Sequence, residues 1–487
     1  MINRKHIKTF SFITAAALMM SVASCSKSNS GTEAASASSE KATVSDKSSS
    51  EVLSSDDIDI SKEISNDEDG AHAIEADGET SEYSNLKVTK TGDSDSGDEA
   101  DFYGDNSAIF ATNGATLTLS DIVVDTDGTH ANAVFSYGDG TTVNISNSVI
   151  TTTGNCSGGL MTTGGGTMNA TDLTIHTTGN SSAAIRSDRG GGTVNVDGGS
   201  YTTDGKGSPV IYSTADITVS NAVMESTSSQ GVVVEGKNSV TLNNVELIAD
   251  NNTKNSDKSE YYQAVMIYQS MSGDAAEGLA TFNMTGGSLT NANGDVFFVN
   301  NTATTITLED VQIVNRDADG VFLRAAAAGW GSSGANGGKV NLYLKDQDLT
   351  GDMIVDDIST LNMYLSSGTT YSGAINADNS EGQIYVEIES GSKWVLTEDS
   401  YITSLTCDAD GIELNGHTLY VNGVEYTQGT TSSGEAIEII SESSGRSGSP
   451  DGMPGDPPSG SPDGKPGDPP SGERPEGDHP KGGPDKK

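Results

Sequence analysis

The chain has 487 residues, with 69 acidic against 26 basic side chains and a formal net charge of −43. Nucleic acids and anionic lipid surfaces attract proteins through Lys and Arg, so this charge excludes nucleic-acid binding and membrane docking by a basic patch. Only 33% of the residues are hydrophobic and glycine is abundant, at 58 residues, which predicts a thin and regular core.

The N-terminus predicts export and lipid anchoring. Arg4, Lys5 and Lys8 precede an apolar stretch, residues 10–22, that is shorter than a membrane-spanning helix. The stretch leads into the letters VASC, which place Cys25 where bacterial lipoproteins carry their lipid. We interpret residues 1–24 as a lipoprotein signal peptide and Cys25 as the lipidation site, which attaches the protein to a membrane at the bacterial cell surface. Ordinary secretion after cleavage at a small residue is the alternative.

Both ends of the mature chain have compositions that do not support a core. Residues 25–82 are rich in Ser and acidic side chains, which predicts a solvated tether. Eleven of the twelve prolines follow residue 449, and the 12-residue motif SPDGMPGDPPSG recurs as SPDGKPGDPPSG across residues 449–472. We therefore predict that residues 429–487 form a disordered tail.

Between these flanks, over residues 83–382, a short pattern recurs about every 24 residues. Each copy contains three β-prone pieces, such as AIFAT, TLTLS and IVVDT within residues 108–126, separated by Gly, Asn or Asp. One inward-facing anchor aligns the copies: Leu117, Val143, Met168, Val194, Ile217, Val240, Phe282, Ile306 and Val340. Two longer intervals contain polar insertions, residues 251–260 and 329–338.

Three strands in about 24 residues are typical of one coil of a parallel β-helix, whose stacked coils hydrogen-bond to one another. Propeller blades are longer, and leucine-rich repeats have a Leu/Asn consensus that is missing here. Residues 383–428 depart from the pattern and are predicted to cap the stack. The predicted fold class is all-β, a right-handed parallel β-helix with three strands per coil.

A resemblance to known proteins lies in GNSSAAIRSDRGGGTVNVDGGSYTTDGKGSPVIYSTADITV, residues 179–219, together with FYGDNSAIFAT and EGKNSVTLNN. These segments resemble a family of bacterial exported proteins that are described as adhesin-like and have a pectin-lyase-like right-handed β-helix. The resemblance covers about residues 83–425. It implies this fold and a cell-surface location, and it transfers no catalytic residues.

One column of side chains beside the inward positions is a candidate binding surface. It reads Phe110, Phe135, Met161, Arg186, Tyr212 and Glu235, and Tyr268 and Arg324 are predicted to continue it. If these side chains face outward, aromatic rings alternate with charges along a sheet, which suits sugar binding. If loops cover the sheet, the same side chains are packed.

The segment Arg186-Ser187-Asp188-Arg189 strengthens this candidate, because paired guanidiniums bind carboxylates well. Ion pairs with neighbouring acidic groups are the alternative. The predicted ligand-binding residues are Phe110, Phe135, Arg186, Asp188, Arg189, Tyr212 and Glu235.

An acidic cluster and a polar ladder are two further candidates. Asp93, Asp95, Asp98 and Asp101 predict either a loose calcium site or a solvated loop, since their spacing is not that of an EF-hand. No other cofactor is predicted. A second column, on the face opposite the inward anchors, repeats Thr and Asn and suits either coil stacking or binding to a repetitive surface. It consists of Thr118, Asn144, Asn169, Asn195, Thr218, Thr241, Asn283, Thr307 and Asn341.

These features together predict an adhesin-like binding protein whose partner is an extracellular polysaccharide or a cell-surface glycan. Two alternatives remain. The first is a calcium-dependent polysaccharide lyase or another glycan-active enzyme of this fold, and the second is a passive stalk that displays the C-terminal tail.

Overall fold

A computed structural model describes residues 52–256, 258–270 and 272–439. The predicted signal peptide, the lipidation site Cys25, residues 25–51 of the predicted tether and the tail from residue 440 onward lie outside the described residues. No described helix is long and apolar enough to cross a membrane.

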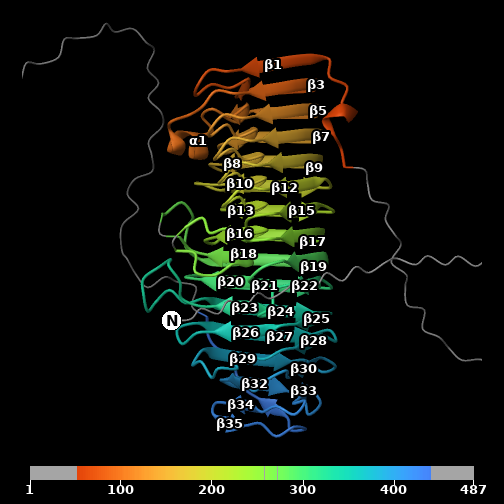
Figure 1. Ribbon diagram of the computed structural model, residues 1–487, viewed down its shortest axis with the longest axis vertical. Coiled ribbons are helices and arrows are strands. Elements are labelled where there is room, and N and C mark those ends of the chain that lie inside the picture. The colour runs from red at the N-terminus through yellow and green to blue at the C-terminus, as the bar shows by residue number, and fades with distance from the viewer. Residues whose placement is uncertain (1–51, 257, 271, 440–487) are drawn as a thin grey trace, which may run out of the picture. The chain divides into compact units, whose positions relative to one another are not determined.

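The described residues form an all-β body in which parallel strands are stacked in chain order (Figure 1). The largest sheet has 18 strands and is named sheet A. Its strands are β1 (Lys62–Asn66), β3 (Thr80–Lys90), β5 (Thr116–Thr126), β7 (Thr142–Thr152), β9 (Gly166–Thr177), β11 (Gly192–Asp197), β12 (Ser200–Thr203), β14 (Asp216–Ser220), β15 (Val223–Ser226), β17 (Ser239–Ala249), β19 (Leu279–Asn291), β21 (Ala303–Glu309), β22 (Gln312–Asn315), β24 (Lys339–Lys345), β27 (Thr360–Ser366), β29 (Gln383–Ile388), β32 (Ser404–Cys407) and β36 (Ser432–Ser433).

Sheet B has 11 strands, all parallel, and alternates with sheet A along the chain. Its strands are β2 (Ile74–Asp77), β4 (Ile109–Thr112), β6 (Val134–Tyr137), β8 (Leu160–Thr163), β10 (Ile185–Ser187), β13 (Ile211–Ser213), β16 (Val232–Glu235), β18 (Gln263–Tyr268), β20 (Asp295–Asn300), β23 (Val321–Ala325) and β26 (Asp352–Val355).

Two small sheets complete the C-terminal part. Sheet C contains β25 (Asp348–Thr350), β28 (Thr370–Ser372), β30 (Lys393–Val395) and β33 (Ile412–Glu413), and sheet D contains β31 (Ser400–Ile402), β34 (Leu419–Val421) and β35 (Val424–Glu425). The pairs β32–β36 and β34–β35 are antiparallel, in contrast to the parallel pairs elsewhere. A 3₁₀ turn, η1 (Ser55–Asp57), and a helix, α1 (Gly97–Tyr103), lie near the N-terminal end of the body.

Each early repeat supplies one strand to sheet B and one long strand to sheet A. The predicted piece AIFAT contains β4, whereas TLTLS and IVVDT join into the single strand β5. This strand bends at Asp121, whose φ is 54°, and the next strand bends at Asn147, with φ 47°. Asn and Asp tolerate this left-handed backbone better than other non-glycine residues. Their recurrence between the predicted pieces therefore marks a bend rather than a break.

The register of the stack follows the predicted anchors closely. The first eight anchors, from Leu117 to Ile306, pair with one another in sequence along sheet A. The ninth was misplaced by two residues, because Ile306 pairs with Leu342 and Val340 pairs with Thr304. A shift of two keeps Val340 on the inward face, which is why the alternation of side chains did not reveal it.

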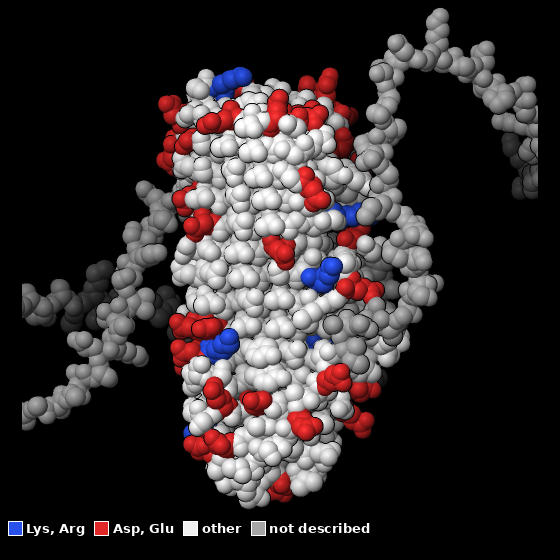
Figure 2. All heavy atoms as spheres, turned by 180° about the vertical axis from the view of Figure 1, so that it is seen from behind, with Lys and Arg blue, Asp and Glu red and all other residues white. Residues whose placement is uncertain are grey.

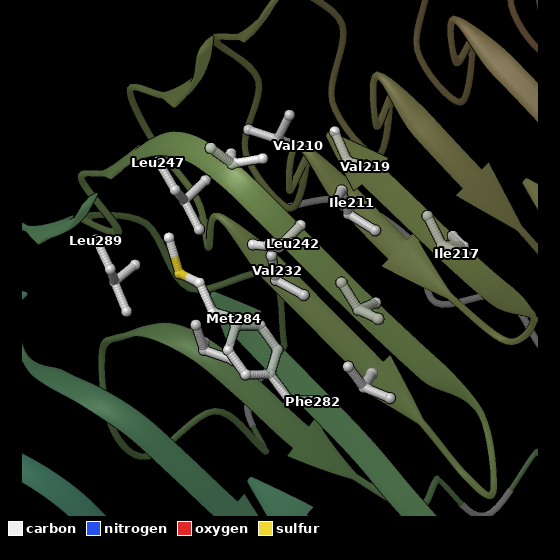
Figure 3. Packing of buried hydrophobic residues seen from close by; sticks show 14 of the residues in the cluster. Val210, Ile211, Ile217, Val219, Val232, Leu242, Leu247, Phe282, Met284 and Leu289 are labelled. Carbon is white, nitrogen blue, oxygen red and sulfur yellow. The ribbon is translucent and has the colours of Figure 1, made fainter. Parts of the chain in front are cut away.

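The anchors line a single interior that runs the length of the body. Val143, Met168 and Val194 are each at most 1% exposed and belong to one cluster of buried apolar side chains. Figure 3 shows part of this cluster, where Ile217, Leu242 and Phe282 lie among side chains from neighbouring strands. Alternation of buried apolar and outward polar residues along the strands thus gives one continuous core.

The ordered body extends further toward the N-terminus than predicted. Strands β1 and β2 and the start of β3 fall inside residues 25–82, the predicted tether, and β1 pairs with β3 in parallel register. Ile74 and Ala76 face the core and alternate with outward acidic residues on β2. The many acidic residues in this segment made the sequence predict a tether instead of a strand. At the other end, β29 and β32 in the predicted cap extend sheet A before the antiparallel pair β34–β35.

Candidate functional site

The N-terminal half of the predicted binding column is buried rather than exposed. Sheet B does align Phe110, Phe135, Met161 and Arg186 in register. However, Phe110 is 8% exposed and Phe135 is fully buried, because Gly104 at the end of helix α1 lies against both rings and His72 stacks on Phe110. The hydroxyl of Thr163 donates a hydrogen bond of 2.7 Å to the carbonyl of Phe102 in this helix. Phe110 and Phe135 thus do not face outward in this structure, and their contact with a ligand stays a prediction.

Helix α1 ends at Gly104, where the backbone lies against the rings of Phe110 and Phe135. Gly104 has a φ of 87°, and a Cβ atom on it would approach the ring of Phe110 to 2.4 Å. Only glycine combines that backbone with that clearance. The sequence pattern of the repeats gives no sign of this helix, because it interrupts them between β3 and β4.

In the C-terminal half of the predicted column, Tyr212 and Glu235 are not paired as the sequence predicted. Tyr212 pairs with Val233, not with Glu235, and Glu235 instead pairs with Tyr268 on the next strand. Loops from the two predicted insertions cover this part of sheet B, since Tyr261 packs on Phe298 and Trp330 packs on Tyr268. The ring centroids of the last pair are 5.2 Å apart.

Arg186 lies at the centre of a compact ionic network between α1 and sheet B. Its Nη2 atom is 2.7 Å from the Asp188 carboxylate and 3.3 Å from that of Asp101. Burial alone would raise the pKa of Asp101, but Arg186 and then His130 hold this pKa below its usual value. Burial raises the pKa of Asp188 despite the same guanidinium. Arg186 is thus neutralised by the protein itself, as the ion-pair alternative predicted.

Tyr212, Glu235 and Tyr268 form a second polar group next to this network. Both tyrosine hydroxyls donate to the same Glu235 oxygen, the one from Tyr268 over 3.1 Å. Burial raises the pKa of both tyrosines above the ordinary value. Glu235 is 2% exposed, and its other carboxylate oxygen has no partner among the described atoms. These residues are packed inside the covering of sheet B.

Arg189 has different partners from Arg186 and connects two elements that cover sheet B, the loop after β18 and helix α1. Its guanidinium contacts Asp274 at 2.7 Å and lies 3.9 Å above the ring of Phe102. Asp274 belongs to the loop after β18, whereas Phe102 belongs to α1, so one side chain joins both covers. The two arginines of the RSDR segment therefore do not act as a pair.

The four carboxylates of the predicted calcium site are not brought together. Asp93 accepts a hydrogen bond of 2.7 Å from the backbone of Thr129, and Asp101 faces Arg186 and His130. Asp95 and Asp98 are exposed. Within the described ranges, no group of three or more His, Cys, Asp or Glu side chains has an arrangement that could hold a metal ion.

His130 joins the Arg186 network through Asp101, and the turn of Cys156 stacks on the turn of His130; the sequence reasoning missed both. His130 Nδ1 is 3.2 Å from Asp101 Oδ1, and the backbone N–H of His130 donates to the carbonyl of Asn155, next to Cys156, over 2.9 Å. The segments GTHA, GNCS and GNSS occupy the same position in successive repeats, just before β6, β8 and β10. Aligning the repeats at these turns would have placed His130 beside Cys156.

This arrangement predicts a stability that falls at alkaline pH. Hydrogen bonds to Asp101 and then Cys156 raise the pKa of His130 to about 10, from 6.5. The folded state therefore keeps a proton that the unfolded state releases, so this stabilisation is complete below about pH 6.5 and is lost as the pH rises through about 10. We expect His130 to contribute a fall of about 2–4 kcal/mol in the free energy of unfolding over this range.

Urea unfolding at a series of pH values measures this fall. The matched variant is His130→Asn, because Asn also accepts the φ of 57° found at His130. Its free energy of unfolding should decline less steeply than that of the wild-type protein. Equal slopes for the two proteins would contradict the assignment.

The outer face of sheet A presents a regular array of polar side chains among the described residues. From β5 to β21, the outward positions of the first half of each strand are Thr, Ser or Asn, except at three acidic residues and at the first residues of β19 and β21: Asp197, Asp216, Glu309, Leu279 and Ala303. The Thr, Ser and Asn residues are half-buried or exposed. We name this array the polar face. Figure 2 shows one side of the body, where acidic side chains outnumber basic ones around a broad uncharged strip.

Hydrogen bonds between successive coils order the polar face. Asn169 Nδ2 donates to Asn144 Oδ1 over 2.9 Å, and Asn195 Nδ2 donates to Asn169 Oδ1 over 3.0 Å. A shallow hollow lies over this region, and its lining includes Asn169, Asn195 and Thr218. The predicted column is thus confirmed as a continuous ladder up to Thr307.

Two tyrosines follow the polar face toward the C-terminus. Tyr343 pairs with Thr307, and its ring stacks on that of Tyr364 with centroids 4.6 Å apart. The segment after β36 then crosses sheet A, since Ile437 exchanges two backbone hydrogen bonds with the side chain of Asn362. This crossing covers Asn362 and leaves Tyr343 half-buried, so it limits the polar face at this end.

Comparisons with known proteins give no match to a family model, a curated protein or a solved structure. Membership of the bacterial adhesin-like family stays a prediction.

Proposed function

We propose that sheets A, B and C are the sides of a right-handed parallel β-helix, with one coil per repeat. Support comes from the alternation of strands between sheets A and B along the chain, with parallel pairing inside each sheet. Crossovers between parallel strands are right-handed in nearly all proteins. We further propose that the chain is exported and held at the bacterial cell surface by a lipid on Cys25, as the sequence of residues 1–25 indicates.

On this scaffold, we propose that the protein binds an extracellular polysaccharide along the polar face. The observation that carries the proposal is the central column of outward Thr and Asn side chains, which continues without a break from Thr118 on β5 to Thr307 on β21. Coils about 4.8 Å apart present hydroxyl and amide groups at a constant repeat, so a polymer of similar repeat makes many weak contacts that add up.

The charge of the protein selects the kind of polysaccharide. The polar face is nearly uncharged, but the chain around it has a net charge of −43. A polyanion such as a uronate polymer is repelled unless cations screen it, whereas a neutral polymer is not. The proposed ligand is therefore a neutral glycan in an extended conformation.

Binding is favoured over polysaccharide lyase activity by the state of Arg186. A lyase of this fold needs free cationic groups to neutralise and deprotonate a uronate. Arg186 is instead paired with Asp101 and Asp188, and Arg189 is paired with Asp274. Neither guanidinium is available to a substrate without breaking an existing ion pair.

Cosedimentation with insoluble polysaccharides tests the proposal. We expect the full chain to bind at least one neutral polymer, such as cellulose, xylan or chitin, and to bind polygalacturonate less. Asn195→Lys places a long charged side chain on the polar face and should weaken binding by about tenfold. The matched control is Thr202→Lys, which introduces the same side chain on β12 of the same repeat, outside the polar face.

Three results would contradict the proposal. One is the absence of binding to every neutral polymer, and another is an equal loss of binding in both variants. A third is binding that disappears when residues 440–487 are removed and is insensitive to Asn195→Lys, which would favour the passive stalk.

A further inference from the structure

The C-terminal segment of the described chain is itself an extended polymer bound across sheet A. After β36, residues 434–439 leave the direction of the strands. The backbone of Glu435 exchanges two hydrogen bonds of 3.0 and 3.1 Å with the side chain of Ser404 on β32. The backbone of Ile437 exchanges two with the side chain of Asn362 on β27. Ser404 and Asn362 lie two register steps apart in one column, so the segment runs along the column and across the strands.

Asn362 binds this segment through both ends of its carboxamide. Its Oδ1 accepts a hydrogen bond of 3.0 Å from the backbone N–H of Ile437, and its Nδ2 donates one of 2.8 Å to the carbonyl of the same residue. The same Nδ2 also donates to Asn341 Oδ1 over 3.0 Å, on the preceding coil. A carboxamide has two donor hydrogens and an acceptor oxygen. One Asn can therefore extend a ladder and still bind a neighbouring donor and acceptor on another chain, an arrangement that we call a clamp.

The surface under this segment is continuous with the polar face. The column of Ser404 and Asn362 passes through Asn341 to Thr305, which belongs to the polar face. The segment is held by hydrogen bonds from outward Ser and Asn side chains, the residue types that also make up the polar face. Its contacts therefore show how sheet A holds an extended chain that is laid across the strands.

Asn195 on the polar face has the arrangement of Asn362, but it is exposed. Its Nδ2 donates to Asn169 Oδ1 on the preceding coil, and Thr218 follows it in register. Within the described ranges, its Oδ1 and its second Nδ2 hydrogen have no hydrogen-bond partner. The donor and the acceptor that Asn362 uses for the segment are thus open to a ligand at Asn195.

We propose that Asn195 clamps two adjacent hydroxyl groups of the bound polysaccharide, accepting a hydrogen bond from one and donating to the other. Two neighbouring hydroxyls on a sugar ring place a donor and an acceptor side by side, as the N–H and C=O of Ile437 do at Asn362. Asn283 lies three register steps further along the column, about 14 Å away, and supplies a second clamp to the same polymer. This role of Asn195 rests on the proposed function, and it narrows the ligand to neutral polymers with free vicinal hydroxyls.

Cosedimentation with cellulose and xylan, each untreated and after acetylation of its hydroxyls, tests the clamp. Acetylation keeps the polymer neutral but removes the hydroxyl donors. We expect the full chain to bind at least one of the untreated polymers and to bind its acetylated form at least about tenfold more weakly, because two hydrogen bonds are lost at each clamp. Asn195→Thr should bind the untreated polymer about tenfold more weakly than the wild-type protein does, and the acetylated polymer equally.

The control is Asn252→Thr, the same replacement at an exposed position in the loop after β17, which should bind like the wild-type protein. Far-ultraviolet circular dichroism checks that the variants are folded. If Asn195→Thr does not fold, Asn283→Thr decides, and it is expected to behave in the same way.

Equal binding of the untreated polymer by the wild-type protein and folded Asn195→Thr would overturn the clamp and leave the proposed function standing. Retention on chitin alone would do the same, because an acetamido group replaces one hydroxyl of each vicinal pair in that polymer. A complete absence of binding to neutral polymers would instead contradict the proposed function. Binding to a synthetic peptide of residues 434–439 and to no polysaccharide would overturn both.

Discussion

Replacing Arg186 by methionine is expected to lower the free energy of unfolding by about 3–5 kcal/mol. The guanidinium is the shared partner of Asp101 and Asp188, and the side chains of these three residues are between 9% and 17% exposed. Methionine keeps much of the apolar contact but leaves two carboxylates with little solvent and no cation. The cost is the burial of uncompensated charge, not the loss of one surface ion pair.

The matched control for this variant lies three residues away. Arg189 is also paired with an aspartate, but its side chain is 47% exposed. Arg189→Met should therefore change the free energy of unfolding by less than about 1 kcal/mol. Urea unfolding at neutral pH measures both variants. A similar small loss in both would mean that the Arg186 network is solvated and does not hold α1 on sheet B.

Replacing Phe282 by alanine is expected to cost about 3–5 kcal/mol. Phe282 is fully buried, and its ring packs edge-to-face on Phe297, with centroids 5.4 Å apart. The narrow interior of stacked strands cannot collapse around the missing ring without breaking the register of β19 with its neighbours. The cavity should therefore persist.

Leu279→Ala is the control on the same strand, because Leu279 is 43% exposed. It should change the free energy of unfolding by less than about 0.5 kcal/mol. Thermal and urea unfolding of both variants give the comparison. If Phe282→Ala is no more destabilising than Leu279→Ala, then β19 does not face a packed interior.

The sequence predicts the stacking well because the same inward-facing position can be recognised in each copy of the repeat. An inward anchor recurs at nearly constant spacing from Leu117 to Ile306, and any one-residue error would turn the core residues outward. Errors of two residues escape this rule, which explains the misplacement of Val340 and of Glu235. The same inward alternation at Ile74 and Ala76 was overlooked because acidic residues surround it.

The covering of sheet B could not be predicted from the repeat. Phe110 and Tyr212 have the alternation of outward residues, and only the packing of α1 and of the inserted loops decides that Phe110 is buried and Tyr212 partly buried. Those elements lie outside the repeat, so no periodic signal locates them. Sheet A carries no such insertion over its first halves from β5 to β21, and its polar ladder was correctly placed.

Distances between spin labels test the stacked register most directly. Thr118 and Thr307 are separated by seven register steps along the polar face, although they are far apart in the sequence. In a chain whose native cysteines are replaced by serine, labels at these two positions should give one narrow distance near 34 Å, at about 4.8 Å per step. A broad distribution, or a distance well above this value, would contradict the stack and with it the polar face and the stacking of the His130 and Cys156 turns.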